Sequence, residues 1–329
     1  MLAVLQSSAT MKKYRYMLEY VGLVTAQAII LSLPFLWLRH IANVFGSCAY
    51  FFDTRGRKVA LANLEAAFGE RYTPRERARI ARRSYCTFAR SMLEMLWSAN
   101  VDEKFSHEKC RTVFVGDHSV THEAGQGVIN TCFHYSNFEW LGVVGCYTIG
   151  LGTVIAADMK NPYIRNLIRR SREHTGRPVI AQEGAVLKMF KLMKRGGRFG
   201  IVVDLTLSPQ EGGVLVSAFG GLMMSVTPMH VVLAQKTGAV LQPLQCRPND
   251  DDGYYTLTVH PLIRCAPEDD MRQRVQECWD VHERAIHERP ECWLWSYKHW
   301  RYKPREDDTS RYPFYAKVSE AFEELLARD

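Results

Sequence analysis

Two histidines in the chain are each followed five residues later by a glutamate, a spacing that can build a catalytic dyad. The pairs are His118 with Glu123 and His134 with Glu139. A histidine that is oriented by a carboxylate can take a proton from a hydroxyl or from water during attack on a carbonyl carbon. Two pairs are close to what chance gives for 11 histidines and 35 acidic residues, so context has to decide. His118 lies in the polar run 116–123 and is predicted to be a surface residue.

The surroundings of His134 favour the second pair. An apolar run at 128–133 comes directly before it and predicts a buried strand. Open α/β sheets place their ligand crevices at the carboxyl ends of such strands. Asn137 can cap a helix that begins at Phe138, which would put Glu139 in the first helical turn and let its side chain meet His134.

Motifs for other kinds of catalysis are absent from the sequence. It contains no G-x-S-x-G nucleophile elbow, no P-loop and no G-x-G-x-x-G between a strand and a helix. It also lacks H-E-x-x-H, and we predict neither a metal nor a cofactor. The nine cysteines are odd in number, widely spread and form no C-x-x-C pair, which favours a reducing, cytosol-facing environment.

Composition fits one large folded chain. With 329 residues, 47% of them hydrophobic, the chain can bury a sizeable core, and disordered and low-complexity classes are excluded. The net charge of +7 predicts a moderately basic surface that attracts anionic partners such as phosphates, acidic lipids or an acidic protein.

The N-terminal part carries a candidate membrane-anchoring helix. Residues 20–38 include no charged side chain, and a helix of this length just matches the hydrocarbon thickness of about 30 Å. Gln27, Ser32 and Pro34 interrupt the apolar stretch, so crossing the bilayer, lying in its interface and packing in a core remain open. Basic residues stand on both sides of the stretch and leave its orientation undecided.

The rest of the chain divides into a helical section and an α/β section. The sequence Thr73-Pro74-Arg75-Glu76 predicts a capped helix start, and the helical pattern continues to about residue 100. We assign residues 1–45 to the anchor, 46–110 to a helical section and 111–329 to an α/β domain with C-terminal helices. Strands are predicted at 128–133, 153–156, 178–180, 199–203, 240–244 and 255–259.

A basic helix is predicted within the α/β section at 161–175. Arg165, Arg169 and Arg172 fall on one side of it, away from an apolar side. They form either a solvated stripe or a surface for a phosphate-bearing substrate or an acidic carrier protein.

Several ordered motifs resemble one known family. His134-Tyr135-Ser136-Asn137-Phe138-Glu139 is similar to the H-x4-[D/E] motif of the bacterial lipid A biosynthesis acyltransferases, which are lauroyl and myristoyl transferases in the glycerolipid acyltransferase superfamily. The resemblance extends from the anchor to Pro304. It includes Ala62–Phe68, Lys160-Asn161-Pro162, Arg172 before Gly176, Asp204, Phe219-Gly220-Gly221, Thr227 and the tryptophan-rich tail Trp293–Pro304.

The resemblance implies a glycerolipid-acyltransferase-like mixed sheet flanked by helices, and an enzyme of the bacterial inner membrane whose catalytic domain faces the cytosol. It would move a fatty acyl chain from a thioester of acyl carrier protein or coenzyme A to a glycolipid hydroxyl. His134 would be the general base, and Glu139 would hold its tautomer. Arg172 would stabilise the oxyanion or bind phosphate, and the remaining substrate-binding candidates are Asn137, Asp204 and Thr227.

Other roles for these residues stay open. Arg172 and Asp204 can form a structural ion pair, while Asn137 and Thr227 can be helix caps. The tryptophan-rich tail is interpreted as packing and an interfacial aromatic belt, with Lys298, Arg301 and Lys303 available to lipid phosphates.

Two departures from the family pattern bear on the acceptor. Ala156-Ala157-Asp158 replaces the family's Tyr-Arg-Pro, and Leu205 follows Asp204 where the family has glutamine. We expect acyl transfer to a lipid A precursor, without nucleic acid as a partner. The alternatives are another glycolipid or a lysophospholipid as acceptor, a thioesterase or esterase with the same dyad, and a non-catalytic membrane adaptor.

Overall fold

The structure is a computed structural model that describes residues 2–118, 122–156, 160–173, 175–176, 179–181, 184–305 and 311–327. Some residues named in the predictions lie outside these ranges. They are Ala157 and Asp158 of the departure from the family pattern, His174 of the predicted basic helix and Pro178 of a predicted strand.

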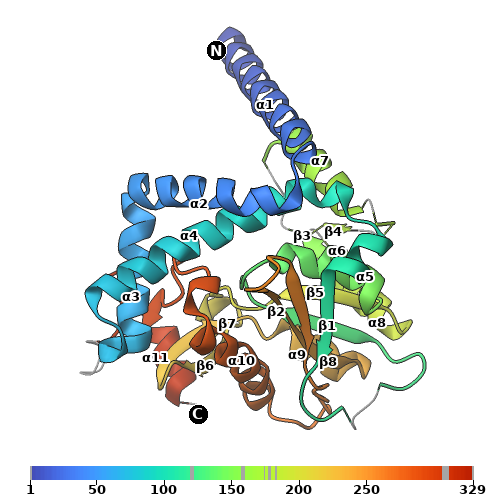
Figure 1. Cartoon of the computed structure of the whole chain (residues 1–329). Helices are drawn as coiled ribbons and strands as arrows, with labels where there is room; N and C mark the ends of the chain where they lie inside the picture. The colour runs from blue at the N-terminus through green and yellow to red at the C-terminus, as the bar shows by residue number, and fades with distance from the viewer. Residues whose placement is uncertain are drawn as a thin grey trace.

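A seven-stranded sheet forms the centre of the molecule (Figure 1). Its strands run in the order β1 (Cys110–Phe114), β9 (Tyr255–Val259), β8 (Val240–Pro248), β2 (Val128–Cys132), β5 (Arg198–Val202), β3 (Thr153–Ala156) and β4 (Val179–Ala181). Only β8 and β9 pair antiparallel within it, and the other neighbours are parallel. The predicted mixed α/β sheet is therefore confirmed.

All six predicted strand segments carry a strand, whereas others were not predicted. The additional ones are β1, which adds to the sheet edge beside β9, the hairpin of β6 (Val214–Ala218) and β7 (Leu222–Val226), and the short pair β10 (Tyr302–Lys303) and β11 (Lys317–Val318). The division of the chain at residues 45 and 110 stays a prediction.

Helices cover both faces of the sheet. After the two N-terminal helices, the chain forms α3 (Thr54–Phe68), α4 (Pro74–Trp97), α5 (Glu103–Lys109), α6 (Phe138–Thr148), α7 (Pro162–Glu173), α8 (Ala185–Lys194), α9 (Met229–Thr237), α10 (Met271–Glu288) and α11 (Glu320–Ala327). Ile129 and Phe133 pack with α8, α9 and α10 in one apolar cluster, while Cys132 packs with α4 and α6 in another. The alternation of side chains along β2 thus joins two cores through the central strand.

The long helix α4 begins as its sequence predicts. The Thr73 side chain accepts a hydrogen bond from the backbone of Glu76, whose carboxylate accepts one from the backbone of Thr73, and Pro74 is the first helical residue. This capping box satisfies backbone donors that the first turn would otherwise leave without partners.

The N-terminal apolar stretch forms two helices, so the prediction of a single helix over residues 20–38 is wrong. Helix α1 ends at Leu31, and α2 (Phe35–Phe52) begins after a break at Ser32, Leu33 and Pro34. A proline ring cannot follow a helical residue without a clash, and it lacks the N–H that the helix would need. None of the helices in the described ranges combines the length and apolar composition required to cross a membrane.

Helix α1 projects from the body, and its C-terminal half lies against α7 (Figure 1). Gln27, which interrupts the apolar sequence, is buried there. Its amide nitrogen donates to Ser171 Oγ at 3.0 Å and to the carbonyl oxygen of Leu96 at 3.4 Å. Nearer the N-terminus, the Asn161 amide donates to Glu19 at 2.9 Å. Polar residues of α1 therefore attach it to α7, while much of its apolar surface stays exposed.

Helix α2 lies across α4 at short range because Gly46 has no side chain. A Cβ atom at Gly46 would lie 2.4 Å from Cα of Cys86, which is much closer than carbon atoms approach. A side chain at this position would force the two helices apart.

We predict that Gly46→Ala lowers the free energy of unfolding by about 1–3 kcal/mol, as expected for an overpacked contact. Urea titration of the variant checks this. Gly22→Ala is the matched control, because no atom of the described residues lies within 4 Å of the added carbon in the middle of α1. It should be neutral or stabilise by up to about 1 kcal/mol, since alanine favours a helix over glycine. Equal stability of the two variants would contradict the close helix contact.

Candidate active site

The register of two central strands brings His134 and Asp204 together. Cys132 at the end of β2 pairs with Val202 at the end of β5, and the N–H of Val203 donates to the carbonyl oxygen of Cys132. His134 and Asp204 each stand two residues beyond these strand ends, at the carboxyl edge of the sheet. The predicted position of His134 at the end of a buried strand is therefore confirmed.

Within the part of the chain that the structure describes, Asp204 accepts three hydrogen bonds, two of them from His134. Its Oδ1 lies 2.8 Å from Nδ1 of the imidazole, and its Oδ2 accepts the backbone N–H of His134 at 3.0 Å. The indole N–H of Trp293 also donates to Oδ2, at 2.8 Å. Asp204 is fully buried, whereas the His134 side chain keeps 17% of its surface exposed. The carboxylate is thus enclosed, and the imidazole is partly open.

His134 and Asp204 each stabilise the charged form of the other. Burial alone would lower the pKa of His134, but the charge and hydrogen bond of Asp204, with the charge of Glu139, outweigh it and hold this pKa above its usual value. Burial would raise the pKa of Asp204, yet His134 and the donors around it hold it below its usual value. An ionised Asp204 requires a proton on Nδ1, which leaves Nε2 as the basic nitrogen of the neutral ring.

Glu139 contacts Arg172, and this corrects the predicted pairing of Glu139 with His134. Arg172 donates from Nε to Oε2 at 3.0 Å and from Nη2 to Oε1 at 2.5 Å, which is a bidentate ion pair. Both side chains are largely buried. The parallel strands bring a closer carboxylate to the imidazole, and α7 brings a guanidinium to Glu139. The open alternative that Arg172 pairs with Asp204 is wrong for the same reason.

Asn137 caps α6 as predicted. Its Oδ1 accepts the backbone N–H of Trp140 at 3.2 Å, and its amide nitrogen donates to Oε2 of Glu94 at 2.5 Å. Its fully buried side chain is thereby engaged at both ends and fixes where α6 begins. This places Glu139 in the first helical turn.

A buried ion pair that was not predicted from the sequence supports the cap. Glu94 is fully buried in α4, and Arg90 one turn earlier donates to its Oε1 at 2.6 Å. The hydroxyl of Tyr255 donates to Oε2 at 2.7 Å, on the same oxygen as Asn137. Burial raises the pKa of Glu94, while these three donors favour its carboxylate form. The sequence signal for this ion pair is Glu94, an acidic residue on the apolar face of α4.

The C-terminal tail fixes the turn between His134 and α6. Ser136 has a φ of 51°, which is unusual for a residue other than glycine, and its N–H donates to the carbonyl oxygen of Cys292 at 2.6 Å. The hydroxyl of Ser91 donates to the carbonyl oxygen of Ser136, also at 2.6 Å. The strained turn is thus held from both sides.

The tryptophans of the tail are buried and do not form the predicted interfacial belt. Trp293, Trp295 and Trp300 are at most 1% exposed and belong to the core cluster of α9 and α10. The prediction of packing is confirmed and that of a belt is wrong, because aromatic side chains that fill a core cannot also face lipid.

The remaining predicted residues lie in different settings. On α7, Arg169 is exposed and pairs with Glu173 at 3.7 Å, whereas Arg172 turns toward Glu139. The Thr227 hydroxyl accepts the N–H of Met229, the first residue of α9, at 3.3 Å. Val226 before it bridges to Thr206, close to Asp204 in the chain. Thr227 therefore lies beside the segment that carries Asp204.

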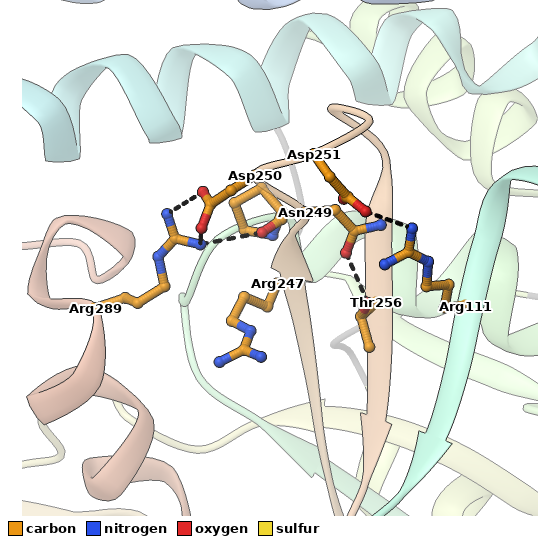
Figure 2. A pocket seen from close by; sticks show the side chains of 8 residues that line it. Arg111, Arg247, Asn249, Asp250, Asp251, Thr256 and Arg289 are labelled. Carbon is orange, nitrogen blue, oxygen red and sulfur yellow. Dashed lines mark hydrogen bonds and ion pairs between the residues drawn. The ribbon is translucent and has the colours of Figure 1, made fainter.

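A cavity of about 530 Å³ lies at the ends of β8 and β9, and none of the predicted site residues line it (Figure 2). Its lining residues are Arg111, Arg247, Pro248, Asn249, Asp250, Asp251, Thr256 and Arg289. Arg111 pairs with Asp251, Arg289 with Asp250, and Arg247 with Glu288. Each of the three lining arginines is therefore already paired with a carboxylate.

A histidine held by a buried carboxylate at the carboxyl edge of a mixed sheet is suited to proton transfer in acyl chemistry. The chain belongs to the bacterial lipid A biosynthesis acyltransferase family, whose model matches residues 5–302. It is therefore an acyltransferase, and the resemblance drawn from its motifs is confirmed.

Two proteins show what the chain is similar to. It is 24% identical over 308 residues to the lipid A biosynthesis lauroyltransferase of Escherichia coli (strain K12), covering 91% of this chain and 95% of the relative. A crystal structure of the 1-acyl-sn-glycerophosphate (LPA) acyltransferase PlsC from Thermotoga maritima matches with a TM-score of 0.36 and 18% identity. That match covers 76% of this chain and 97% of the other.

Proposed function

We propose that the protein transfers a fatty acyl chain from a thioester to a hydroxyl of a lipid A precursor, with His134 as general base. The observation that carries this proposal is the hydrogen bond between Nδ1 of His134 and Asp204 at 2.8 Å, because it leaves Nε2 to accept the proton of the hydroxyl. The family and its lauroyltransferase member support the lipid A precursor as acceptor. The donor is a thioester of acyl carrier protein or of coenzyme A.

The proposed reaction balances without a metal, a cofactor or a protein nucleophile. Nε2 of His134 takes the hydroxyl proton as the oxygen attacks the thioester carbonyl carbon. The tetrahedral oxyanion then collapses, the C–S bond breaks, and the imidazolium gives its proton to the departing sulfur. The products are an ester and a free thiol.

Arg172 is the proposed cation for the oxyanion or for a substrate phosphate. Glu139 accepts hydrogen bonds from Nε and Nη2 of Arg172. The two N–H groups of Nη1 are not part of this ion pair. The bidentate contact fixes the plane of the guanidinium, so that its charge is already oriented before the substrate binds. Thr227, beside the Asp204 segment, is the further substrate-binding candidate.

An acceptor-dependence assay tests the reaction class. The purified protein is given an acyl thioester with a lipid A precursor, with a lysophospholipid, or with no acceptor, and both acylated lipid and free thiol are measured. We expect acylated product with the lipid A precursor and little thiol without it. Product only with the lysophospholipid would rename the acceptor, and equal thiol release without any acceptor would establish the thioesterase alternative.

We also propose that the enzyme works at the bacterial inner membrane with its catalytic domain facing the cytosol. The outer side of α2 carries an exposed apolar surface, which we call the α2 surface: Trp37, Val44, Phe45, Phe51 and Phe52. Helix α2 contains no acidic residue, and Lys12, Lys13 and Arg15 belong to α1. An apolar helix side suits the interface of a bilayer, and the cations of α1 suit anionic lipid headgroups.

We predict that the double variant Phe45→Ser and Phe52→Ser binds membranes at least about tenfold more weakly, since burying one phenylalanine contributes about 1.5–3 kcal/mol. Co-sedimentation with vesicles of phosphatidylethanolamine and phosphatidylglycerol measures the binding. Phe314→Ser is the matched control, because Phe314 is 72% exposed, like Phe45 at 62% and Phe52 at 77%, but lies near the C-terminus. An equal loss of membrane binding in Phe314→Ser and in the double variant would contradict the assignment of the α2 surface as the membrane contact.

A further inference from the structure

We infer that Asp204, held by the indole of Trp293, is the positioning residue for His134, and that Glu139 serves Arg172 instead. This inference rests on the proposed function, because it assigns roles around the same general base. The sequence alone pairs His134 with Glu139 of the H-x4-E spacing, whereas the inference assigns Glu139 to Arg172.

The first observation is that Asp204 holds both ends of the histidine. One carboxylate oxygen faces the ring nitrogen and the other accepts the backbone N–H of the same residue. The imidazole is therefore fixed in position and in tautomer by a single side chain. Because Asp204 is fully buried, water does not compete for these contacts.

The second observation is that Trp293 holds Asp204. Its indole nitrogen donates at 2.8 Å to the carboxylate oxygen that does not face the ring. Trp293 is itself fixed, since its ring stacks on His299 with centroids 3.9 Å apart and its carbonyl oxygen accepts the Ser84 hydroxyl. Rotation of the carboxylate away from His134 would break the indole hydrogen bond.

The third observation is that Glu139 is already engaged. Both of its carboxylate oxygens accept hydrogen bonds from Arg172, and α6 is fixed at its start by Asn137. Glu139 acts on His134 through its charge, whereas Asp204 acts through charge and a hydrogen bond.

Among the described residues, three titratable groups face His134 from the surrounding elements. Asp204 follows β5, Glu139 lies in α6, and His299 lies in the C-terminal tail. Burial lowers the pKa of His299 to about 4, so it is neutral in the range where His134 titrates. The acid limb of the pH–rate profile should therefore report the titration of His134 in the presence of the Asp204 and Glu139 carboxylates.

The test is the pH dependence of kcat/KM for the full chain with a thioester donor and the lipid acceptor. Asp204→Asn removes the charge that raises the pKa of His134, so its acid limb should move to lower pH. Its maximal rate should fall by about 100-fold or more, because an amide no longer fixes the tautomer. Glu139→Gln should move the limb less than Asp204→Asn.

Trp293→Phe should move the acid limb in the opposite direction. Without the indole donor, more of the carboxylate's charge acts on His134, which raises its pKa and shifts the limb to higher pH. Trp295→Phe is the matched control. Its indole also donates from the buried tail, but to the carbonyl oxygen of Pro290, so it should leave the limb in place.

Outcomes separate this inference from the proposed function. Full activity of His134→Ala would overturn both. An inactive His134→Ala with an unmoved limb in Asp204→Asn, or a larger shift in Glu139→Gln, would overturn the positioning role alone. If Asp204→Asn does not fold, ¹⁵N NMR of the wild-type histidines, assigned with His134→Gln, decides. In the neutral ring, at a pH above the pKa of His134, a proton on Nδ1 supports the inference, and a proton on Nε2 contradicts it.

Discussion

His134→Ala should lower the rate of acyl transfer by about 100-fold or more, because a positioned general base contributes at least that factor. The variant should keep its fold, since the side chain is partly open and alanine leaves the Asp204 contact to the backbone N–H in place. Product formation under saturating donor and acceptor measures the loss, and circular dichroism checks the fold.

His118→Ala is the control for this prediction. His118 has the same spacing to a glutamate, but its ring contacts the carbonyl oxygen of Val115 and the ring of Phe114 at the surface edge of β1. It should retain wild-type activity. Similar losses in both variants would contradict the assignment of the general base to the histidine beside Asp204.

Glu94→Leu should cost about 3–5 kcal/mol of unfolding free energy, which is a large part of the stability of a typical protein. The substitution leaves the buried Arg90 guanidinium without its carboxylate and removes an acceptor from Asn137 and Tyr255. We expect the first turn of α6 to loosen as well, because Asn137 caps it. Denaturant titration measures the stability.

The double variant Glu94→Leu with Arg90→Met separates the ion pair from packing. Removing both charges eliminates the uncompensated guanidinium, so the double variant should be more stable than Glu94→Leu alone. A single variant that loses less than about 1 kcal/mol, or a double variant that is the less stable of the two, would contradict the account of this network.

Much of the fold follows from local sequence patterns. The capping box at Thr73, the apolar run before His134 and the cap at Asn137 all form as predicted, because each depends on neighbours in the chain. The break at Pro34 also has a local cause, because the proline ends α1, although one continuous helix was predicted there.

The contacts within the site depend on residues far apart in the chain. His134 and Asp204 meet through the register of β2 and β5, and Trp293 joins them from the C-terminal tail. No spacing within one segment encodes these distances. The strand ends were nevertheless predicted at 133 and 203, so the adjacent positions of His134 and Asp204 were available as a signal once the two strands were assumed to be neighbours.

The most direct measurement of the central claim is mass spectrometry of lipids from the source organism with the gene intact, deleted, or restored as wild type or as His134→Ala. We expect that deletion removes one acyl group from lipid A, that the wild-type gene restores it, and that His134→Ala does not. The mass difference gives the chain length. Unchanged lipid A after deletion, or restoration by His134→Ala, would contradict the account.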